Sequence, residues 1–154
     1  MADDTIIAVS TPPGFGGLGV LRLSGPAARR VASRLFKARS RPRRAFPPRT
    51  AILGDLLDAK AGERLDEAVL VFFPGPESYT REDLVEITCH GSPVVLEQAV
   101  RLGIGAGARH ARPGEFTRRA FIGGRIDILE AQAVNDLIMA RSLEQAKISA
   151  RQLG

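Results

Sequence analysis

The sequence predicts an α/β fold of the α+β kind, with a mixed sheet first and helices after it. Short β-branched or alternating segments bounded by Gly and Pro indicate strands as far as residue 111. From Glu115 onward the composition changes to helix formers with apolar residues at helical spacing. The chain has 154 residues, 44% hydrophobic and 25% charged, which suffices to bury a core and disfavours disorder.

The first elements are two strands and a helix. Thr5–Ser10 is a β-branched run that ends in a Pro- and Gly-rich turn reaching Gly17, which predicts a strand and a turn. Residues 19–24 alternate, with Leu21 and Leu23 on one face, so a second strand follows directly. Pro26 is expected to open a helix that continues through Phe36.

The middle of the chain predicts three further strands. Residues 50–57 and 67–73 read as strands joined by a hairpin-length connection that contains Gly62. Thr80 and Asp83 have the spacing of a capping box, which predicts one helical turn. Residues 84–89 then alternate as a third strand.

The last part is expected to be helical. A helix is predicted over residues 94–102, a short strand over 108–111, and helices from Glu115 to the end. Asp127 with Glu130, and Ser142 with Gln145, have capping-box spacing. We therefore expect an α/β domain over residues 1–116 and the beginning of a helical domain over 117–154, which looks cut short. Its apolar surface from Ile126 to Ile148 should be exposed unless a partner covers it.

Positive charge gathers in the first third of the chain. The net charge is +5, yet residues 5–54 carry ten basic side chains and no carboxylate, which leaves 12 basic and 17 acidic residues elsewhere. This tract contains Arg22, Arg29, Arg30, Arg34, Lys37, Arg39, Arg41, Arg43, Arg44 and Arg49. Either it binds phosphates of RNA, or it is a solvated loop in a chain that uses Arg 19 times and Lys three times.

Several site classes are disfavoured. Gly14–Gly19 matches GxGxxG, but a strand pattern follows it where a dinucleotide site needs a helix. No GxxxxGK[ST] phosphate loop occurs, so this segment has no catalytic GTPase residues of its own. The lone Cys89 excludes a disulfide framework, and His90 and His110 lack metal-ligand spacing. The acidic start and the lack of ~18 consecutive apolar residues predict a soluble, cytoplasmic protein.

Adjacent Cys89 and His90 suggest a nucleophile beside its base. Neighbouring residues on a strand point to opposite faces, however, so the two side chains should not meet. Cys89 is therefore expected to be a small core residue.

Arg22 and Glu86 are charges placed in the middle of predicted strands. A half-buried charge must be paired or must face a ligand. Two interpretations stay open at this point: the two residues pair with each other, or they bind a polar ligand with complementary groups.

Taken together, several blocks of the sequence closely resemble the N-terminal part of the tRNA modification GTPases of the MnmE family, also called TrmE. The matching stretches are Asp4–Ala8, Thr11–Gly14, Gly16–Gly25, Phe73–Thr80, Glu82–Asp83, Glu86, Cys89–Gly91, Arg112–Thr117, Arg119–Phe121 and Asp127–Leu137. They occur in the same order from one end of the chain to the other, which makes the resemblance far more specific than any single glycine pattern.

The resemblance implies a folate-binding, homodimerising α/β domain related to the tetrahydrofolate-binding domains of aminomethyltransferases. It also implies that the full-length protein hydrolyses GTP, with Mg and K, in a G domain that would lie beyond Gly154. With the FAD-dependent partner MnmG, such a protein modifies the 5-position of the wobble uridine of tRNA. No membrane takes part.

By the same resemblance, Arg22, Glu86 and Arg125 are the expected contacts of a ligand like 5-formyl-tetrahydrofolate. Glu86 would accept hydrogen bonds from the pterin, and the arginines would hold a carbonyl or the glutamate end. Members of the family often have Lys where Arg125 stands here, and Phe15 and Arg81 also replace commoner residues. The alternatives are a basic RNA-binding module and a purely structural dimerisation domain.

Overall fold

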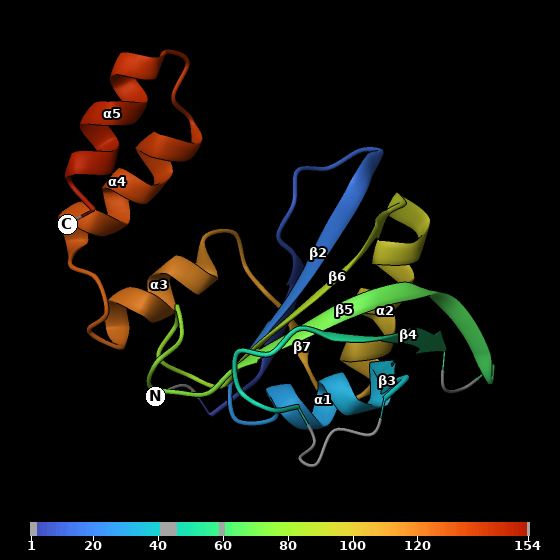
Figure 1. The fold of residues 1–154 in the computed structure, drawn as a ribbon. Coiled ribbons are helices and arrows are strands. Elements are labelled where there is room, and N and C mark those ends of the chain that lie inside the picture. Colours follow the sequence, from blue (N-terminus) through green and yellow to red (C-terminus); the bar gives the residue numbers. More distant parts are fainter. Residues whose placement is uncertain (1–2, 41–45, 59–60, 154) are drawn as a thin grey trace.

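The fold is a seven-stranded mixed sheet with helices on one face and three more helices beyond it (Figure 1). The computed structural model describes residues 3–40, 46–58 and 61–153. The strands are β1 (Ile6–Val9), β2 (Gly16–Ser24), β3 (Phe36–Ala38), β4 (Ile52–Asp58), β5 (Glu63–Phe73), β6 (Leu84–Gly91) and β7 (Arg109–His110). Their order is β3-β4-β5-β6-β2-β1-β7, and every pair is antiparallel except β1 with β7.

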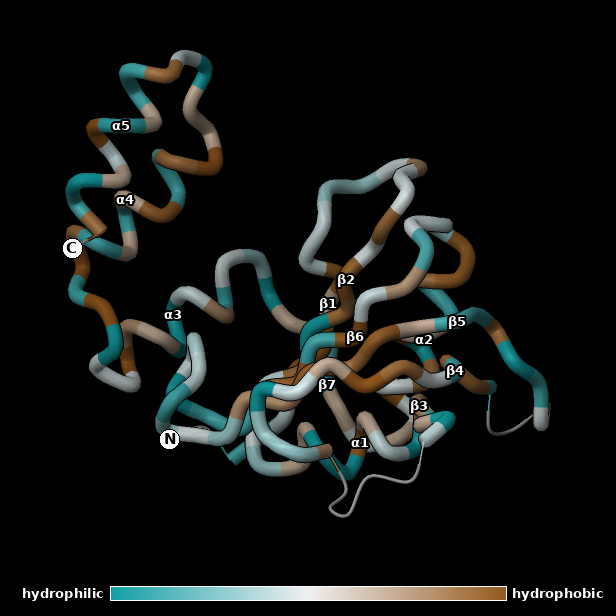
Figure 2. Tube along the Cα trace, in the orientation of Figure 1, coloured by the Kyte–Doolittle hydropathy of each residue, from teal (hydrophilic) through white to brown (hydrophobic). Residues whose placement is uncertain are grey.

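The core lies between the sheet and helices α1 (Ala28–Leu35) and α2 (Pro93–Gly105). The inward residues of the central strands alternate with outward ones, because side chains on a strand point to opposite faces. Leu21 and Leu23 of β2 are fully buried, whereas Arg22 between them points to the other face. Figure 2 shows the hydrophobic residues gathered along these central strands.

Helices α3 (Glu115–Ile122), α4 (Ile128–Ile138) and α5 (Leu143–Arg151) follow the sheet. α4 and α5 pack against each other, and they lie away from the sheet beyond α3 (Figure 1). Of their apolar residues only Ala133 is fully buried, which confirms the predicted exposed apolar surface. The exposed side chains are Ile128, Leu129, Ile138, Met139, Leu143 and Ile148.

The predicted mixed α/β class is confirmed, and most elements lie where the patterns placed them. The Asp127–Glu130 capping box forms in full: Asp127 accepts from the Glu130 N–H, and Glu130 accepts from the Asp127 N–H. At the last helix only half of the box forms. Ser142 Oγ accepts from the Gln145 N–H, but the side-chain oxygen Oε1 of Gln145 accepts from the Arg141 N–H and not from that of Ser142.

Several predicted boundaries were wrong. The strand predicted from residue 67 begins at Glu63, and β2 begins at Gly16, inside the predicted turn. The helix predicted to open at Pro26 begins at Ala28 and ends before Phe36, which starts the unpredicted strand β3. The errors at the strands share one cause: pairing with a neighbouring strand extends or creates a strand where local propensity is neutral or poor.

The helical turn predicted at Thr80 is also wrong. Residues 74–83 form turns, and the side chains of the expected capping box bond elsewhere. Thr80 Oγ1 lies 2.6 Å from Ser24 Oγ, and Asp83 accepts from the Gly75 N–H. Hydrogen bonds to partners outside a local helix turn therefore replace the predicted helix cap at Thr80.

Gly25 marks the tight exit from β2. Its φ of +128° is open to glycine, and a Cβ there would stand 2.5 Å from the Asp4 carbonyl oxygen and 2.8 Å from Thr5 Cα. Both neighbours are backbone atoms that cannot move aside cheaply. By contrast, Gly62 in the β4–β5 turn has φ +71° with nothing within 4 Å of a Cβ.

We expect Gly25→Ala to lower the free energy of unfolding by more than about 2 kcal/mol, because strain and backbone overlap add. Gly62→Ala is the matched control, because it introduces only the strain of a left-handed backbone. This strain should lower the free energy of unfolding by about 1 kcal/mol. Denaturant unfolding measures both variants. Equal losses in the two would show that the overlap at Gly25 relaxes.

Candidate functional site

Arg22 and Glu86 face each other across the centre of the sheet. β2 and β6 pair so that these two residues are direct partners in the register. Arg22 Nη2 and Nε lie 2.6 and 2.9 Å from Glu86 Oε1. Their side chains remain 26% and 28% exposed, on the face opposite the helix-covered core. Both hydrogen bonds use the same carboxylate oxygen, so Glu86 Oε2 bonds to none of the residues that the structure describes.

Aromatic rings flank this ion pair. The guanidinium carbon of Arg22 lies 5.6 Å from the ring centres of both Tyr79 and Phe116, within cation–π range. Arg125, in the connection between α3 and α4, lies 5.8 Å from the same Tyr79 ring. The Tyr79 hydroxyl and Thr117 Oγ1 are 3.0 Å apart, which ties the ring to α3.

The structure thus brings the three predicted site residues to one place. Arg22 and Glu86 touch directly, and Arg125 joins them through the ring of Tyr79. Two carboxylate-binding cations and one carboxylate leave a surplus positive charge beside aromatic faces. Such a cluster suits a flat, polar ligand that carries an anionic group.

Tyr79 and Phe116 were missed by the analysis of charges alone. Both lie outside the strands, in a turn and at the start of a helix, so no strand pattern could place them opposite Arg22. The available signal was that Tyr79 is the one tyrosine of the chain and lies within a matching family block.

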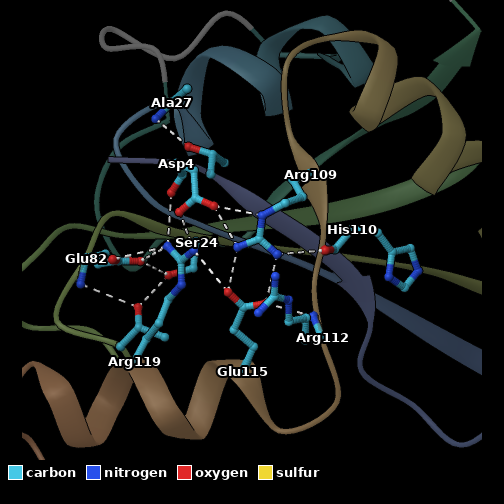
Figure 3. A network of polar contacts seen from close by, with 11 residues as sticks. Asp4, Ser24, Ala27, Glu82, Arg109, His110, Arg112, Glu115 and Arg119 are labelled. Carbon is cyan, nitrogen blue, oxygen red and sulfur yellow. Dashed lines mark hydrogen bonds and ion pairs between the residues drawn. The ribbon is translucent and has the colours of Figure 1, made fainter. Parts of the chain in front are cut away.

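A second cluster, the α3 network, joins α3 to the N-terminal segment and to the turn after β5 (Figure 3). Its centre is Arg119, which is 6% exposed. Its guanidinium nitrogens lie 2.7 Å from Asp4 Oδ1, 3.0 Å from Glu82 Oε2 and 3.4 Å from Glu115 Oε1. Glu82 also accepts a 2.7 Å hydrogen bond from the Ser24 hydroxyl at the end of β2.

Arg109 extends this network across β7. It lies 2.6 Å from both Asp4 Oδ2 and Glu115 Oε1, and Glu115 additionally accepts from the Arg112 N–H. Hydrogen bonding from Arg109, followed by that from Arg112 and Arg119 and opposed by burial, lowers the pKa of Glu115 to about 2. The pKa of Asp4 is lowered as well, chiefly by Arg109.

The α3 network docks α3 on the sheet domain through charges rather than through an apolar face. Among the described residues no buried side-chain nitrogen or oxygen is left without a hydrogen-bond partner, so the burial of these charges is compensated. The sequence analysis missed it because its members are scattered from residue 4 to residue 119. It explains why Arg112, Gly114 and Glu115 occur together: Gly114, with φ +69°, turns the chain so that Glu115 reaches Arg109.

Because the pKa of Glu115 is depressed when folded, its contribution to stability is present above its unfolded value of 4.5 and is lost as the pH falls toward about 2. We expect the free energy of unfolding of the native chain to fall across this window. In Glu115→Gln it should be lower at neutral pH and should depend less on pH within the window. Denaturant titrations at several pH values test this, with Glu97→Gln, which breaks an exposed pair on α2, as the control. Parallel curves for native chain and Glu115→Gln would contradict it.

Cys89 and His90 do not form a catalytic pair, as expected from strand geometry. Cys89 is 3% exposed, and burial raises the pKa of its thiol to about 11, so it stays protonated at neutral pH. His90 points outward, and its Nδ1 lies 2.8 Å from Asp66 Oδ1.

Parts of the basic tract are already paired. Arg39 contacts Asp55 and Glu67, and Arg49 contacts Glu77. Arg30 and Arg34 lie on the exposed side of α1. Arg41, Arg43 and Arg44 lie outside the described residues. The RNA-binding interpretation stays a prediction.

The described residues contain no group of three or more His, Cys, Asp or Glu side chains arranged to hold a metal ion. None of their helices is both long enough and apolar enough to cross a bilayer.

The chain matches known proteins along nearly its whole length. Residues 5–125 match the family described as "GTP-binding protein TrmE N-terminus". The chain belongs to this family. It is 51% identical over 99% of its length to the tRNA modification GTPase MnmE of Koribacter versatilis, and 48% identical over its full length to that of Roseiflexus castenholzii. The MnmE of Thermotoga maritima is 47% identical over 97% of the chain.

The chain spans about a third of the length of these relatives: 33% of the first and 32% of the other two. The matched range contains Arg22, Tyr79, Glu86, Arg119 and Arg125, whereas Asp4 of the α3 network lies just outside it.

Proposed function

We propose that residues 1–116 form a folate-binding domain whose ligand is 5-formyl-tetrahydrofolate or a related reduced folate. The observation that carries the proposal is that Arg22 and Arg125 both lie against the ring of Tyr79, while Arg22 also pairs with Glu86. The same three residues are those that the resemblance to the family implied.

The chemistry of these side chains fits such a ligand. A pterin offers N–H donors on one edge, and Glu86 Oε2 has its acceptor capacity open while Oε1 is held by Arg22. The aromatic faces of Tyr79 and Phe116 supply apolar area for a flat ring system. Arg125 supplies a cation for the carboxylates of the glutamate end. Prior pairing with Arg22 orients Glu86, which reduces the ordering needed on binding.

In this proposal the segment is the N-terminal module of a homodimeric tRNA modification GTPase. The relatives carry that activity in their names. GTP hydrolysis, with its Mg and K ions, would belong to the parts of the relatives that this chain does not span. Partnership with an MnmG-type FAD protein, action on the wobble uridine of tRNA and a cytoplasmic location complete the proposal.

Residues 117–154 would begin the helical domain of such a protein. The exposed apolar side chains of α4 and α5 support this, because a stable two-helix unit would bury them against further helices.

The exposure of these side chains on α4 and α5 also predicts that the 154-residue chain associates with itself through these helices. Replacing Ile138 and Leu143 together by Ser should shift sedimentation toward the smaller species. Leu53→Ser, at an exposed sheet position, is the control, and an unchanged distribution in the double variant would contradict the prediction.

A purely structural dimerisation domain is the second candidate. It is favoured by one observation: Arg22 and Glu86 already satisfy each other at 2.6 Å, as a structural pair would. The two candidates differ in what happens when the pair is broken in a folded protein.

Calorimetric titration with 5-formyl-tetrahydrofolate distinguishes them. We expect saturable binding, weakened about tenfold or more by Glu86→Gln and by Arg22→Ala, because each removes a charge-assisted hydrogen bond. Arg125→Lys keeps the positive charge and should bind more tightly than Arg125→Ala. Glu97→Gln, on α2 and away from the site, should bind as the native chain does. No binding by a well-folded native dimer would leave the structural interpretation.

A further inference from the structure

We propose that the ion pair between Glu82 and Arg119 positions the aromatic walls of the candidate site: it holds Tyr79 and Phe116 in place around Arg22. Neither residue of the pair touches the Arg22–Glu86 contact itself. The proposal rests on the folate-binding function above for its ligand readout, but its structural part is tested without any ligand.

The turn that carries Tyr79 is held in place through Glu82. The residues on either side of Tyr79 are buried and bonded: the Ser78 hydroxyl donates to the Glu82 carbonyl at 2.5 Å, and Thr80 bonds to Ser24. Because the single Ser24 proton goes to Glu82 Oε2, Thr80 is the donor to Ser24. Ser78 thus holds the turn to the Glu82 backbone, and Thr80 connects it to the Glu82 carboxylate through Ser24. The Tyr79 ring remains half-buried at the site.

α3 carries both Phe116 and Arg119. These two residues are three apart, so they lie on neighbouring parts of one helix surface. Arg119 points into the network, Phe116 packs on Arg22, and Thr117 contacts the Tyr79 hydroxyl. A rotation of α3 about its axis would move Phe116 and Thr117 together. The contacts of Arg119 to Asp4 and Glu82, which both lie outside α3, oppose such a rotation.

The contacts of Arg119 are directional. Apolar packing tolerates sliding, whereas a guanidinium with several charge-assisted hydrogen bonds has a narrow geometry. Arg119 Nη1 lies 3.0 and 3.2 Å from the two Glu82 oxygens and 3.0 Å from the Asp4 carbonyl. One side chain thus joins the N-terminal segment, the Tyr79 turn and α3. The N-terminal segment leads into β1, which pairs with β2 next to Arg22. The relative placement of these three segments therefore sets the distance of both rings from Arg22.

The sequence supplies a direct probe of this arrangement. Tyr79 is the only tyrosine and the chain has no tryptophan, so tyrosine fluorescence reports on this one side chain. Quenching by acrylamide measures the solvent access of the ring, and fluorescence anisotropy measures its freedom of motion. Both are read without ligand.

The experiment compares Glu82→Gln and Arg119→Lys with the native chain. Glu77→Gln is the matched control: it makes the same chemical change two residues from Tyr79, but its carboxylate is exposed and pairs with Arg49 rather than α3. Far-UV circular dichroism confirms folding. Titration with 5-formyl-tetrahydrofolate adds the ligand readout, and added Tyr79→Phe shows which part of any affinity loss passes through the ring hydroxyl.

We expect Glu82→Gln to raise the acrylamide quenching constant of Tyr79 about twofold and to weaken folate binding about tenfold, since a small displacement of site groups is costly. Arg119→Lys, which keeps the buried charge but loses the fork, should show a smaller change in the same direction. Glu77→Gln should change neither quantity. If the native chain binds no folate, the quenching comparison still decides the positioning role.

An unchanged quenching constant in a folded Glu82→Gln or Arg119→Lys variant would overturn the proposal. Loss of folding in both variants would overturn it too, because the pair would then support the whole fold rather than position the site. Weakened folate binding with unchanged Tyr79 signals would likewise sink it, since the pair would then act on the ligand by some route other than the aromatic walls.

Discussion

The antiparallel pairing of β2 with β6 is the constraint on which both the core and the site depend. In one register it sets Leu21 beside Ile87 on the face under α1 and α2, and Arg22 beside Glu86 on the face away from them. A slip of one residue would exchange the faces, burying the charges and exposing the leucines. The apolar faces therefore specify the register, and the charged pair is fixed as a consequence of how the core packs.

The sheet domain and α3 are stabilised by different kinds of interaction. The sheet and its two helices are held by burial of aliphatic side chains, which is strong but not directional. α3 is held by the α3 network, whose worth lies in geometry as much as in energy, since replacing a buried charged network with apolar groups often costs nothing. The directional contacts of the α3 network lie where the site needs fixed aromatic rings, and the non-directional apolar packing lies where it does not. This distribution is consistent with the network both docking α3 and positioning the rings.

The sequence predicted what alternation and composition encode, and little that depends on distant partners. The mid-strand positions of Arg22 and Glu86 were found because a charge among apolar neighbours is visible locally. Strand β3 was invisible, because Phe36–Ala38 becomes a strand only by pairing with β4. The turn at Thr80 was wrongly predicted for the same reason. The Thr80 hydroxyl bonds to Ser24, 56 residues away, and does not cap a local helix. Arg125 was predicted as a site residue from the family resemblance alone. The structure adds that the ring of Tyr79 connects Arg125 to Arg22 and Glu86.

These long separations bear on how a ligand would act on the protein. The site takes Arg22 and Glu86 from the sheet, Tyr79 from a turn, Phe116 from α3, and Arg125 from the connection that leads to α4. It can therefore form only after the sheet is paired and α3 is docked, so affinity for a ligand there depends on α3 as well as on the ion pair. By linkage, a ligand that binds only the docked arrangement stabilises it to the same extent. Since α4 and α5 follow α3 directly and have few other contacts with the sheet domain, such a ligand would also restrict where the helical part can lie.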